Sequence, residues 1–395
     1  MTETASRPAY IHSCGFNSAM GQSTSEIRQC LDGTRQSNMV CDTSILNNQA
    51  PTIVGRVKDN LPPLPESLSE FDSRNNRLAL SALLQIEVDV NDAIAKYGSN
   101  RIAVIIGTST SGIYDGELAY QQKIEKGVFP EEYHYRKQEL GNSSEFVSQY
   151  LNISGPCYSI STACSSSGRA FLSAQRLLES QLVDAVVVGG VDTLCQLTLN
   201  GFNSLEALSK GLSQPFCTSR DGINIGEAAA FMLLTREPSS VALLGVGDSS
   251  DAYHISAPSP DGSGAEEAMR KALADANLDP DQIGYINAHG TATPLNDSME
   301  SKAIYRVFGK NVPVSSTKPL TGHTLGAASA TEAAIAWHIL EHDLSIPLQN
   351  CENQASDIQI TLAESPVPLQ RKAILSNSFA FGGNNISLIF GYTHD

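Results

Sequence analysis

One cysteine of the chain stands where a nucleophile would be useful. Cys164 lies in "YSISTACSSSGRAF", between a strand-like segment and a helical pattern that begins at about Ser165. A thiol at a helix N-terminus meets unpaired N–H groups and the positive end of the helix dipole, which lower its pKa and favour the thiolate. Small neighbours leave room for a bulky substrate. The position predicts a nucleophile, although most free cysteines are small core residues.

Two histidines are candidate partners of this thiol. His289 follows a strand pattern in "YINAHGTATPLND", and His323 precedes a long helical pattern in "SSTKPLTGHTLGAA". A helix N-terminus disfavours positive charge, and the nearby Lys318 adds to that effect, so we expect a neutral imidazole at His323. A neutral imidazole can donate one N–H to a carbonyl oxygen. Glu332 lies on the following helix and could pair with Lys318, although an exposed pair of this kind contributes little.

A glycine pair near the C-terminus is a further candidate. In "SNSFAFGGNNIS", Gly382 and Gly383 follow Phe379 and Phe381. Glycines allow main-chain N–H groups to approach a ligand oxygen closely. A plain β-hairpin uses the same pair, so the pattern alone leaves both interpretations open.

Alternating strands and helices must position these groups. Runs rich in Val, Ile, Leu and Ala predict buried strands at 101–107, 184–190, 228–234, 241–247 and 386–391. Apolar residues at helical spacing predict helices over 165–180, 264–276 and 325–340. The alternation favours an α/β layered fold. Similar strand and helix patterns on either side of Pro238 indicate a weak internal duplication, with the reactive residues where the two halves meet.

Composition excludes several classes of protein. With 26 Lys and Arg against 42 Asp and Glu, the net charge of −16 argues against general nucleic-acid binding. Eight scattered cysteines without C-x-x-C spacing indicate reduced thiols rather than a disulfide framework. We see no signal peptide and no apolar run long enough for a transmembrane helix. These features predict a cytoplasmic protein that binds no membrane.

The four motifs, in this order along the chain, resemble those of the β-ketoacyl-[acyl-carrier-protein] synthases. These are condensing enzymes of the thiolase superfamily, and the resemblance is to the elongating, Cys-His-His type. The matching stretches are "STACSSS", "NAHGTATPLND", "SSTKPLTGHTLGAA" and "SNSFAFGGNN", with weaker matches at 220–234 and 249–258. The resemblance implies a thiolase-like fold, layered αβαβα, built from pseudo-duplicated halves at 1–240, which carries the nucleophile, and 241–395.

The resemblance also assigns roles. Cys164 would take an acyl chain from a carrier-protein thioester. His289 and His323 would stabilise the enolate formed when malonyl-acyl carrier protein loses CO₂, and this enolate would attack the acyl-cysteine to give a 3-oxoacyl thioester. Lys318 would support His323, with Glu332 anchoring the lysine. Main-chain N–H groups would form the oxyanion hole, and further residues would bind substrate: Thr291, Thr293, Phe379, Phe381 and Gly382, with Phe381 as the gating aromatic.

Some residues depart from the family pattern. Cys217 stands where aspartate is common, and Ala380 stands where glycine is usual, which puts the gating role of Phe381 in doubt. The stretch 111–140, a region of pocket and dimer contacts in the family, matches primary fatty-acid synthases poorly. It favours a specialised polyene or type II polyketide pathway, although fatty-acid synthesis stays open. Conversely, the histidine in "TGH" and the lack of any cysteine after Cys351 favour elongation over initiation or thiolysis.

The expected partners follow from the same resemblance. The protein would need no resident cofactor or metal, because the phosphopantetheine arm arrives on the acyl carrier protein. It would form a homodimer or a heterodimer with a related synthase-like chain. The candidate basic residues for docking the acidic carrier are Arg74, Arg77, Lys123, Lys126 and Lys210. The alternatives are a non-catalytic chain-length factor, which typically lacks the cysteine, and a cysteine hydrolase using Cys164 and His289.

Overall fold

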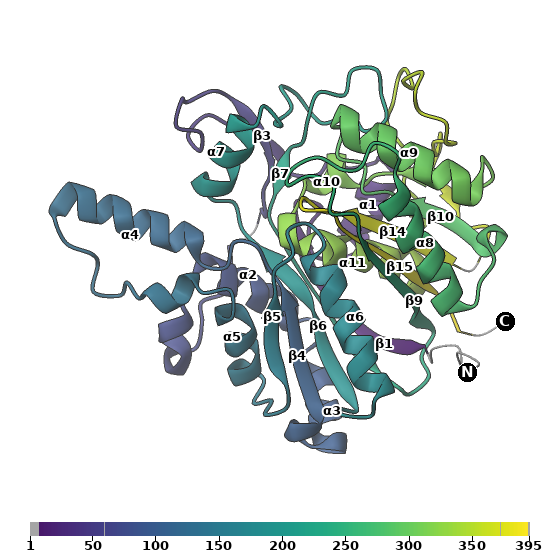
Figure 1. The fold of residues 1–395 in the computed structure, drawn as a ribbon. Helices are drawn as coiled ribbons and strands as arrows, with labels where there is room; N and C mark the ends of the chain where they lie inside the picture. Colours follow the sequence, from purple (N-terminus) through teal and green to yellow (C-terminus); the bar gives the residue numbers. More distant parts are fainter. Residues whose placement is uncertain (1–7, 59, 372, 394–395) are drawn as a thin grey trace.

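The computed structural model describes residues 8–58, 60–371 and 373–393, and within these a ten-stranded sheet forms the centre of the molecule (Figure 1). From edge to edge its strands are β11 (Val314–Ser315), β10 (Ile283–Asn287), β14 (Ala373–Phe379), β15 (Asn384–Tyr392), β9 (Val241–Ser250), β1 (Ala9–Ser18), β8 (Ala228–Thr235), β6 (Ala185–Asp192), β4 (Ile102–Gly107) and β5 (Cys157–Ile160). Short strands form smaller sheets, β12 (Ser345–Ile346) with β13 (Val367–Pro368), and β2 (Met39–Asp42) with β3 (Thr52–Gly55) and β7 (Ile225–Gly226).

The large sheet repeats one strand order. Outward from its middle, the strands run β1-β8-β6-β4-β5 on one side and β9-β15-β14-β10-β11 on the other. In chain order each side reads first, fifth, fourth, second, third. The outer strands of each side pair in parallel, and the inner strands pair antiparallel. β1 and β9 join the two sides through residues 9–11 and 241–243. The prediction of a layered fold from duplicated halves is confirmed.

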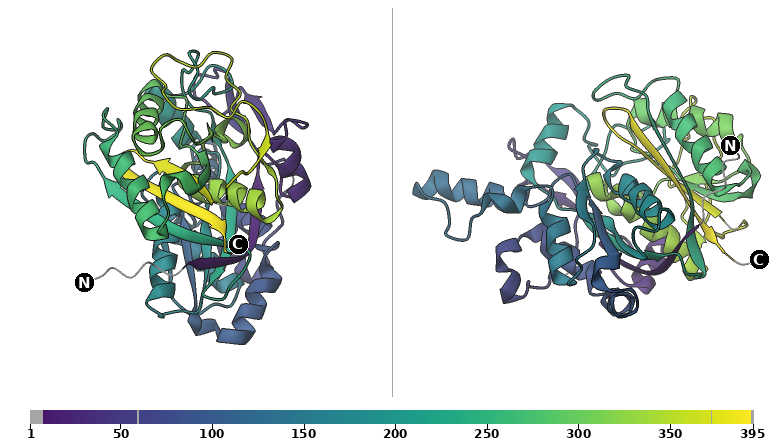
Figure 2. Two further views of the ribbon diagram at one scale, coloured as in Figure 1. Left: turned by 90° about the vertical axis from the view of Figure 1, so that its right-hand side faces the viewer. Right: turned by 60° about the horizontal axis from the view of Figure 1, so that its bottom comes forward.

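Helices form layers between and outside the two sides of the sheet (Figure 2). The described helices are α1 (Thr24–Leu31), α2 (Arg74–Leu83), α3 (Glu87–Tyr97), α4 (Ile113–Lys126), α5 (Asn142–Tyr150), α6 (Ser166–Glu179), α7 (Gln196–Ser204), α8 (Ser263–Ala276), α9 (Pro294–Phe308), α10 (Lys318–Thr321) and α11 (Ala328–Glu341). α6 and α11 contact each other and strands of both sides, so they are the central layer. α2, α3 and α5 cover one outer face, and α8, with α9 beside it, covers the other.

The alternation of side chains along β4 explains why this strand is apolar throughout. Ala103 and Ile105 face the cluster around α6 and α11, whereas Ile102, Val104 and Ile106 face the cluster around α2, α3 and α5. Both faces of the strand are therefore buried, which requires a continuous apolar run rather than an alternating one. The predicted strands are confirmed, and the predicted helices 165–180 and 264–276 match α6 and α8 within a residue or so. The helix predicted over 325–340 opens with a 3₁₀ turn, Leu325–Ala327, before α11.

α4 projects from the rest of the molecule (Figures 1 and 2). It contacts α7 and the 3₁₀ turn Tyr135–Gln138. The carboxylate of Glu117 accepts hydrogen bonds from the main-chain N–H groups of Gln196 and Leu197, at 2.9 and 2.7 Å, and so caps the N-terminus of α7. No helix in the described part of the chain combines the length and apolarity needed to cross a bilayer.

Candidate active site

Cys164 lies in a tight turn between β5 and α6. The preceding Ala163 has a φ of 52°, in the left-handed region that a residue with a Cβ seldom adopts. The turn is held by Ser166, whose hydroxyl accepts from the N–H of Thr162 and donates to the carbonyl of Ala163. Cys164 itself is only 6% exposed. The turn thus fixes the position of a buried thiol at the start of the central helix α6.

The small residues after Cys164 serve packing rather than substrate access, so that part of the prediction is wrong. Ser165, Ser166 and Ser167 are fully buried. A Cβ on Gly107 of β4 would lie 2.2 Å from the main-chain nitrogen of Ser167, and a Cβ on Gly168 would lie 2.6 Å from Ile386. Larger side chains here would push α6 off the sheet and away from β15.

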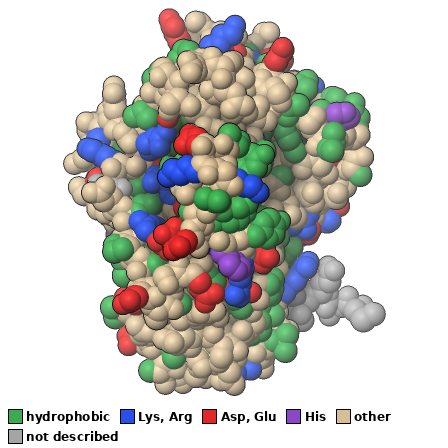
Figure 3. Space-filling model, turned by 90° about the vertical axis from the view of Figure 1, so that its left-hand side faces the viewer, with side chains coloured by type: hydrophobic (Ala, Val, Ile, Leu, Met, Phe, Trp, Pro, Cys, Tyr) green, Lys and Arg blue, Asp and Glu red, His purple; other side chains and the backbone are tan. Residues whose placement is uncertain are grey.

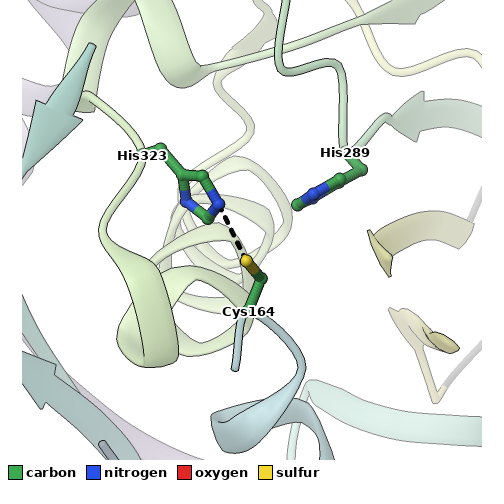
Figure 4. A group of neighbouring side chains, drawn as sticks. All are labelled: Cys164, His289 and His323. Carbon is green, nitrogen blue, oxygen red and sulfur yellow. Dashed lines mark hydrogen bonds between the residues drawn. The ribbon is translucent and has the colours of Figure 1, made fainter. Parts of the chain in front are cut away.

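His323 contacts the thiol directly (Figure 4). Its Nε2 lies 3.0 Å from Cys164 Sγ, and its Nδ1 accepts the main-chain N–H of Leu325 at 3.3 Å. Because Nδ1 is the acceptor, the proton of a neutral ring sits on Nε2 and points to the sulfur. Burial and the charge of Lys318 hold the pKa of His323 well below its ordinary value, as the sequence predicted.

His289 faces the same point from the loop after β10. Its ring lies 5.4 Å from that of His323, nearly perpendicular to it. Its main-chain N–H and that of Gly290 each donate at 2.7 Å to the carboxylate of Glu300 on α9. Burial, the charge of Lys318 and the neighbouring His323 lower its pKa strongly. Two uncharged imidazoles therefore converge on the sulfur (Figure 4).

The predicted pair behind the histidines is present. Lys318 Nζ lies 2.5 Å from Glu332 Oε1, and both side chains are almost fully buried. Burial raises the pKa of Glu332 to about 7, and the adjoining ammonium group offsets part of this rise. Lys318 acts on both histidines through its charge, while its hydrogen bond goes to the carboxylate.

The thiol is not the low-pKa group that its helix position predicts. Burial raises the pKa of Cys164 to about 11. The charge of Lys318 and hydrogen bonds from main-chain N–H groups, including that of Phe381, lower it only in part. Desolvation thus outweighs the favourable electrostatics in the resting site. The N–H of Phe381 nevertheless points at the sulfur, the position expected of an oxyanion-hole donor.

Most of the predicted site residues line one cavity of about 330 Å³. They are Cys164, Thr291, Thr293, His289, His323, Phe379 and Phe381, together with Ala380. The Thr291 and Thr293 hydroxyls lie 2.9 Å apart. The ring of Phe381 is 38% exposed and lies 5.7 Å from that of Phe202 on α7, whereas Phe379 is buried beside His289. The cavity reaches from the sulfur to the surface past these rings.

Gly382 lies outside the described cavity lining. Its φ is 81°, and its N–H donates to the carbonyl of Ile255 at 2.9 Å, so it is not free to bind a substrate oxygen. With Gly383 it forms the turn between β14 and β15, as the hairpin interpretation predicts. The turn sets the direction of the Phe381 N–H.

Buried carboxylates that the sequence reasoning missed fix the reactive loops. Glu300 holds the His289 loop, and Asp297 accepts from the N–H groups of Phe216 and Ala292. Asp192, at the end of β6, accepts from the loop after β4 and from the N–H of Ala327 ahead of α11. Acidic residues inside an otherwise apolar or small-residue stretch, as in "NDSMES", were the available signal.

Two of the proposed carrier-docking residues are already paired. The guanidinium of Arg74 binds the fully buried carboxylate of Glu227 at 2.5 and 3.1 Å. Arg77 binds Asp72 at 2.5 Å. Sequence could not reveal the partner of Arg74, because Glu227 is 153 residues away along the chain. Neither arginine is a free docking group in this structure.

The expectation of reduced cysteines is wrong for one pair. Cys217 and Cys351, 134 residues apart, form a disulfide with Cα atoms 5.5 Å apart. Their wide separation gave no spacing signal, and folding brings their segments together. The remaining cysteines of the described chain are thiols. Among them, Cys164 with His289 and His323 presents ligand atoms within 4.8 Å of one another, close enough to share a metal ion.

Comparison with known proteins agrees with this geometry. The sequence profile of the beta-ketoacyl synthase N-terminal domain matches residues 66–239, and that of the C-terminal domain matches residues 241–352. The 3-oxoacyl-[acyl-carrier-protein] synthase 2 of Staphylococcus aureus is 33% identical over 79% of each chain. The synthase of the same name from Synechocystis is 34% identical over 80% of this chain and 82% of its own.

A solved structure extends the similarity to the whole chain. One chain of the solved complex between the ketosynthase ApeO and its chain length factor ApeC, from Xenorhabdus doucetiae, is 49% identical. It superposes with a TM-score of 0.94 over 98% of both chains. The profile matches include Cys164, His289, Lys318 and His323. The chain belongs to the beta-ketoacyl synthase family.

Proposed function

We propose that this protein catalyses decarboxylative Claisen condensation between an acyl chain on Cys164 and malonyl-acyl carrier protein. The observation that carries the proposal is the convergence of the Cys164 sulfur, two neutral imidazoles and the Phe381 N–H in one cavity. A hydrolase would need a base and a water, whereas these groups offer a nucleophile and hydrogen-bond donors.

The first half-reaction uses the turn before α6. Cys164 Sγ attacks the thioester carbonyl of an acyl carrier protein, and the carrier thiol leaves with the proton. The main-chain N–H groups of Cys164 and Phe381 donate to the oxyanion that forms. One such donor contributes about 2.7–4 kcal/mol to transition-state stabilisation. The phosphopantetheine arm comes with the carrier protein, passing Thr291 and Thr293, so no free cofactor is needed.

The second half-reaction uses the histidines. His289 and His323 donate N–H groups to the malonyl thioester carbonyl, so that the C–C bond to the carboxylate breaks, CO₂ leaves and an enolate remains. The enolate carbon attacks the acyl carbonyl on Cys164, the C–S bond breaks, and a 3-oxoacyl carrier protein is released. Neutral rings suit this role because they need not lose a proton. Burial, and the charge of Lys318 that Glu332 holds in place, lower the pKa of both rings and keep them neutral.

We further propose that the chain works in a heterodimer with a related synthase-like chain, in a polyene or type II polyketide pathway. Support comes from the higher identity to a chain of a solved complex between a ketosynthase and its chain length factor, 49%, than to the 3-oxoacyl-[acyl-carrier-protein] synthase 2 relatives, 33–34%. The face around α4 suits a partner, since hydrophobic side chains gather there beside charged ones (Figure 3). Its exposed apolar residues include Leu118, Ile124, Val128 and Tyr135. Native mass spectrometry of the protein from its source cells would distinguish two unlike chains from two copies.

The alternative function is that of a non-catalytic partner subunit. The intact Cys164, His289 and His323 argue against it. The cytoplasmic location and the division at residues 240 and 241 also remain proposals, which cell fractionation and separate expression of the halves would test.

The decisive experiment is acylation of the purified protein, together with any co-purifying chain, by an acyl carrier protein thioester. Intact mass should rise by one acyl group, and addition of malonyl carrier protein should then give CO₂ and the 3-oxoacyl product. Cys164→Ala should abolish both, while Cys41→Ala, at an exposed thiol, should keep both. If the Cys164→Ala variant condensed substrates at the wild-type rate, the mechanism would be refuted. If the wild-type protein formed no acyl adduct, the partner-subunit alternative would be favoured.

A further inference from the structure

The pair Cys217 and Cys351 joins two segments that the proposed reaction does not use. Cys217 is 1% exposed, in a turn that leads to β7, and Cys351 is half-buried in the segment that follows β12. Their Cα separation of 5.5 Å lies within the range that a disulfide spans without backbone movement. Cys351 is therefore the more exposed residue of the pair.

The two segments are held together by other contacts as well. The Thr218 N–H donates to the carbonyl of Asn353 at 2.8 Å, and the Ala355 N–H donates to the carbonyl of Phe216 at 3.0 Å. Arg220 forms an ion pair with Asp357 at 2.9 Å. Opening the disulfide would therefore loosen this contact rather than unfold the protein.

The Cys217 segment leads directly to the reactive groups. Phe216, the residue before it, donates its N–H to Asp297, which also accepts from Ala292 in the His289 loop. A Cβ on Gly290, next to His289, would lie 3.1 Å from the Phe216 ring. Further along, Asp221 and Ile223 line the cavity. The disulfide thus sits one residue from a support of the His289 loop and a few residues from the cavity wall.

We propose that Cys217 and Cys351 are a reversible redox couple whose oxidation fixes this wall and the His289 loop. The oxidant is a small-molecule disulfide such as glutathione disulfide. The Cys351 thiolate attacks one of its sulfurs, the glutathione S–S bond breaks, and one glutathione leaves. The Cys217 thiolate then attacks the Cys351 sulfur of the mixed disulfide, and the second glutathione leaves. Two protein thiols are oxidised, and one glutathione disulfide is reduced to two glutathiones.

The first test measures the couple itself. The full-length protein is equilibrated at a series of ratios of reduced to oxidised glutathione, quenched with N-ethylmaleimide and digested. A cross-linked peptide containing Cys217 and Cys351 should form at oxidising ratios and disappear at reducing ones. Persistence of both thiols at every ratio, or of the disulfide at every ratio including excess dithiothreitol under native conditions, would overturn the proposal.

The second test measures the consequence by hydrogen–deuterium exchange. Peptides covering 213–223 and 289–297 should exchange at least about threefold more slowly in the oxidised protein, because their protected amides open less readily. Cys351→Ser should exchange like the reduced protein in both buffers, while Cys41→Ser should respond like the wild type. Equal exchange in the two redox states would also overturn the proposal. Neither readout needs condensing activity, so the outcome is independent of the proposed function.

Discussion

The loops after β4 and β10 occupy equivalent places in the two halves and are built alike, yet the second presents an imidazole beside the Cys164 sulfur. After β4, the N–H groups of Ser109 and Thr110 donate to the buried Asp192. After β10, the N–H groups of His289 and Gly290 donate to the buried Glu300. In both, a carboxylate inside the protein fixes the backbone. The β4 loop presents hydroxyl side chains, whereas the β10 loop presents an imidazole.

The central helices repeat the comparison. The approach to α6 includes Ala163 and the approach to α11 includes Leu325, each with a φ of 52°. The first turn presents Cys164 and the second presents His323. Cys164 directly follows Ala163, whereas His323 lies two residues before Leu325, so the two turns present their side chains from different positions. In the proposed mechanism, the first half holds the nucleophile and the second half holds the donors.

The largest expected effect comes from removing a donor of the second half. His289→Ala or His323→Ala should slow CO₂ release from malonyl carrier protein about 10²–10³-fold, the usual loss for one oxyanion donor. Acyl-adduct formation on Cys164 should persist. CO₂ release reports decarboxylation and intact mass reports acylation, so measuring both on the same samples separates the two steps. The variant His134→Ala, at an exposed histidine, serves as the control. Equal loss of both steps would break the proposed division between the halves.

Lys318→Met should destabilise the protein by about 3–5 kcal/mol, because it leaves the buried Glu332 carboxylate without its partner. The double variant with Glu332→Gln should recover much of the loss. Urea unfolding measures both. Lys96→Met, which removes an exposed ion pair with Glu237, should leave the midpoint nearly unchanged. If Lys318→Met and the double variant had the same free energy of unfolding, the loss of stability would not come from leaving the Glu332 carboxylate without its partner.

The thiol pKa of about 11 predicts the pH dependence of alkylation. The thiolate fraction of Cys164 should rise about tenfold per pH unit from pH 7 to 9, and so should its rate of reaction with iodoacetamide. Peptide mapping follows Cys164, with the peptide carrying the exposed Cys41 as a check on the reagent. If the alkylation rate of Cys164 stopped rising at or below pH 8, the helix N-terminus would have a larger effect on the pKa of this thiol than burial has.

The smallest effects distinguish the two carboxylates. Glu300→Gln should slow CO₂ release about tenfold relative to acylation, because a buried N–H of the His289 loop loses a charged acceptor. Asp192→Asn should lower the free energy of unfolding by about 1–3 kcal/mol and leave the ratio of the two rates unchanged. Measuring both rates and urea unfolding for each variant sharpens the comparison of the loops. If Asp192→Asn slowed CO₂ release and Glu300→Gln affected only stability, the loop after β10 would not be the one that supports the chemical step.

The sequence predicted the parts of this structure that local patterns determine. Apolar runs located β4, β6, β8, β9 and β15, and helical spacing located α6 and α8. The thiol and both histidines lie at the end of a strand or the start of a helix, but their roles were predicted from the resemblance of the four motifs to a known family. Spacing along the chain allowed the Lys318–Glu332 pair but left an exposed ion pair of little consequence equally open, and the supporting role was implied by the resemblance.

Features that depend on contacts between distant segments escaped prediction. The pKa of Cys164 depends on how deeply the sulfur is buried, which no local pattern reports. The serines after it are small because β4 approaches α6 closely. Cys217 and Cys351, and Arg74 and Glu227, pair across well over a hundred residues. Glu300 is recognisable as a support only once α9 is seen packing beside the His289 loop.

The capping of α7 by Glu117 has a structural consequence. Glu117 belongs to the projecting α4, and α7 carries Phe202, whose ring packs on Phe381 at the cavity mouth. The short helix α7 thus contacts the outermost helix of the molecule at one end and an aromatic side chain of the cavity lining at the other. The projecting helix and the Phe381 ring therefore share one support, although α4 itself does not line the cavity.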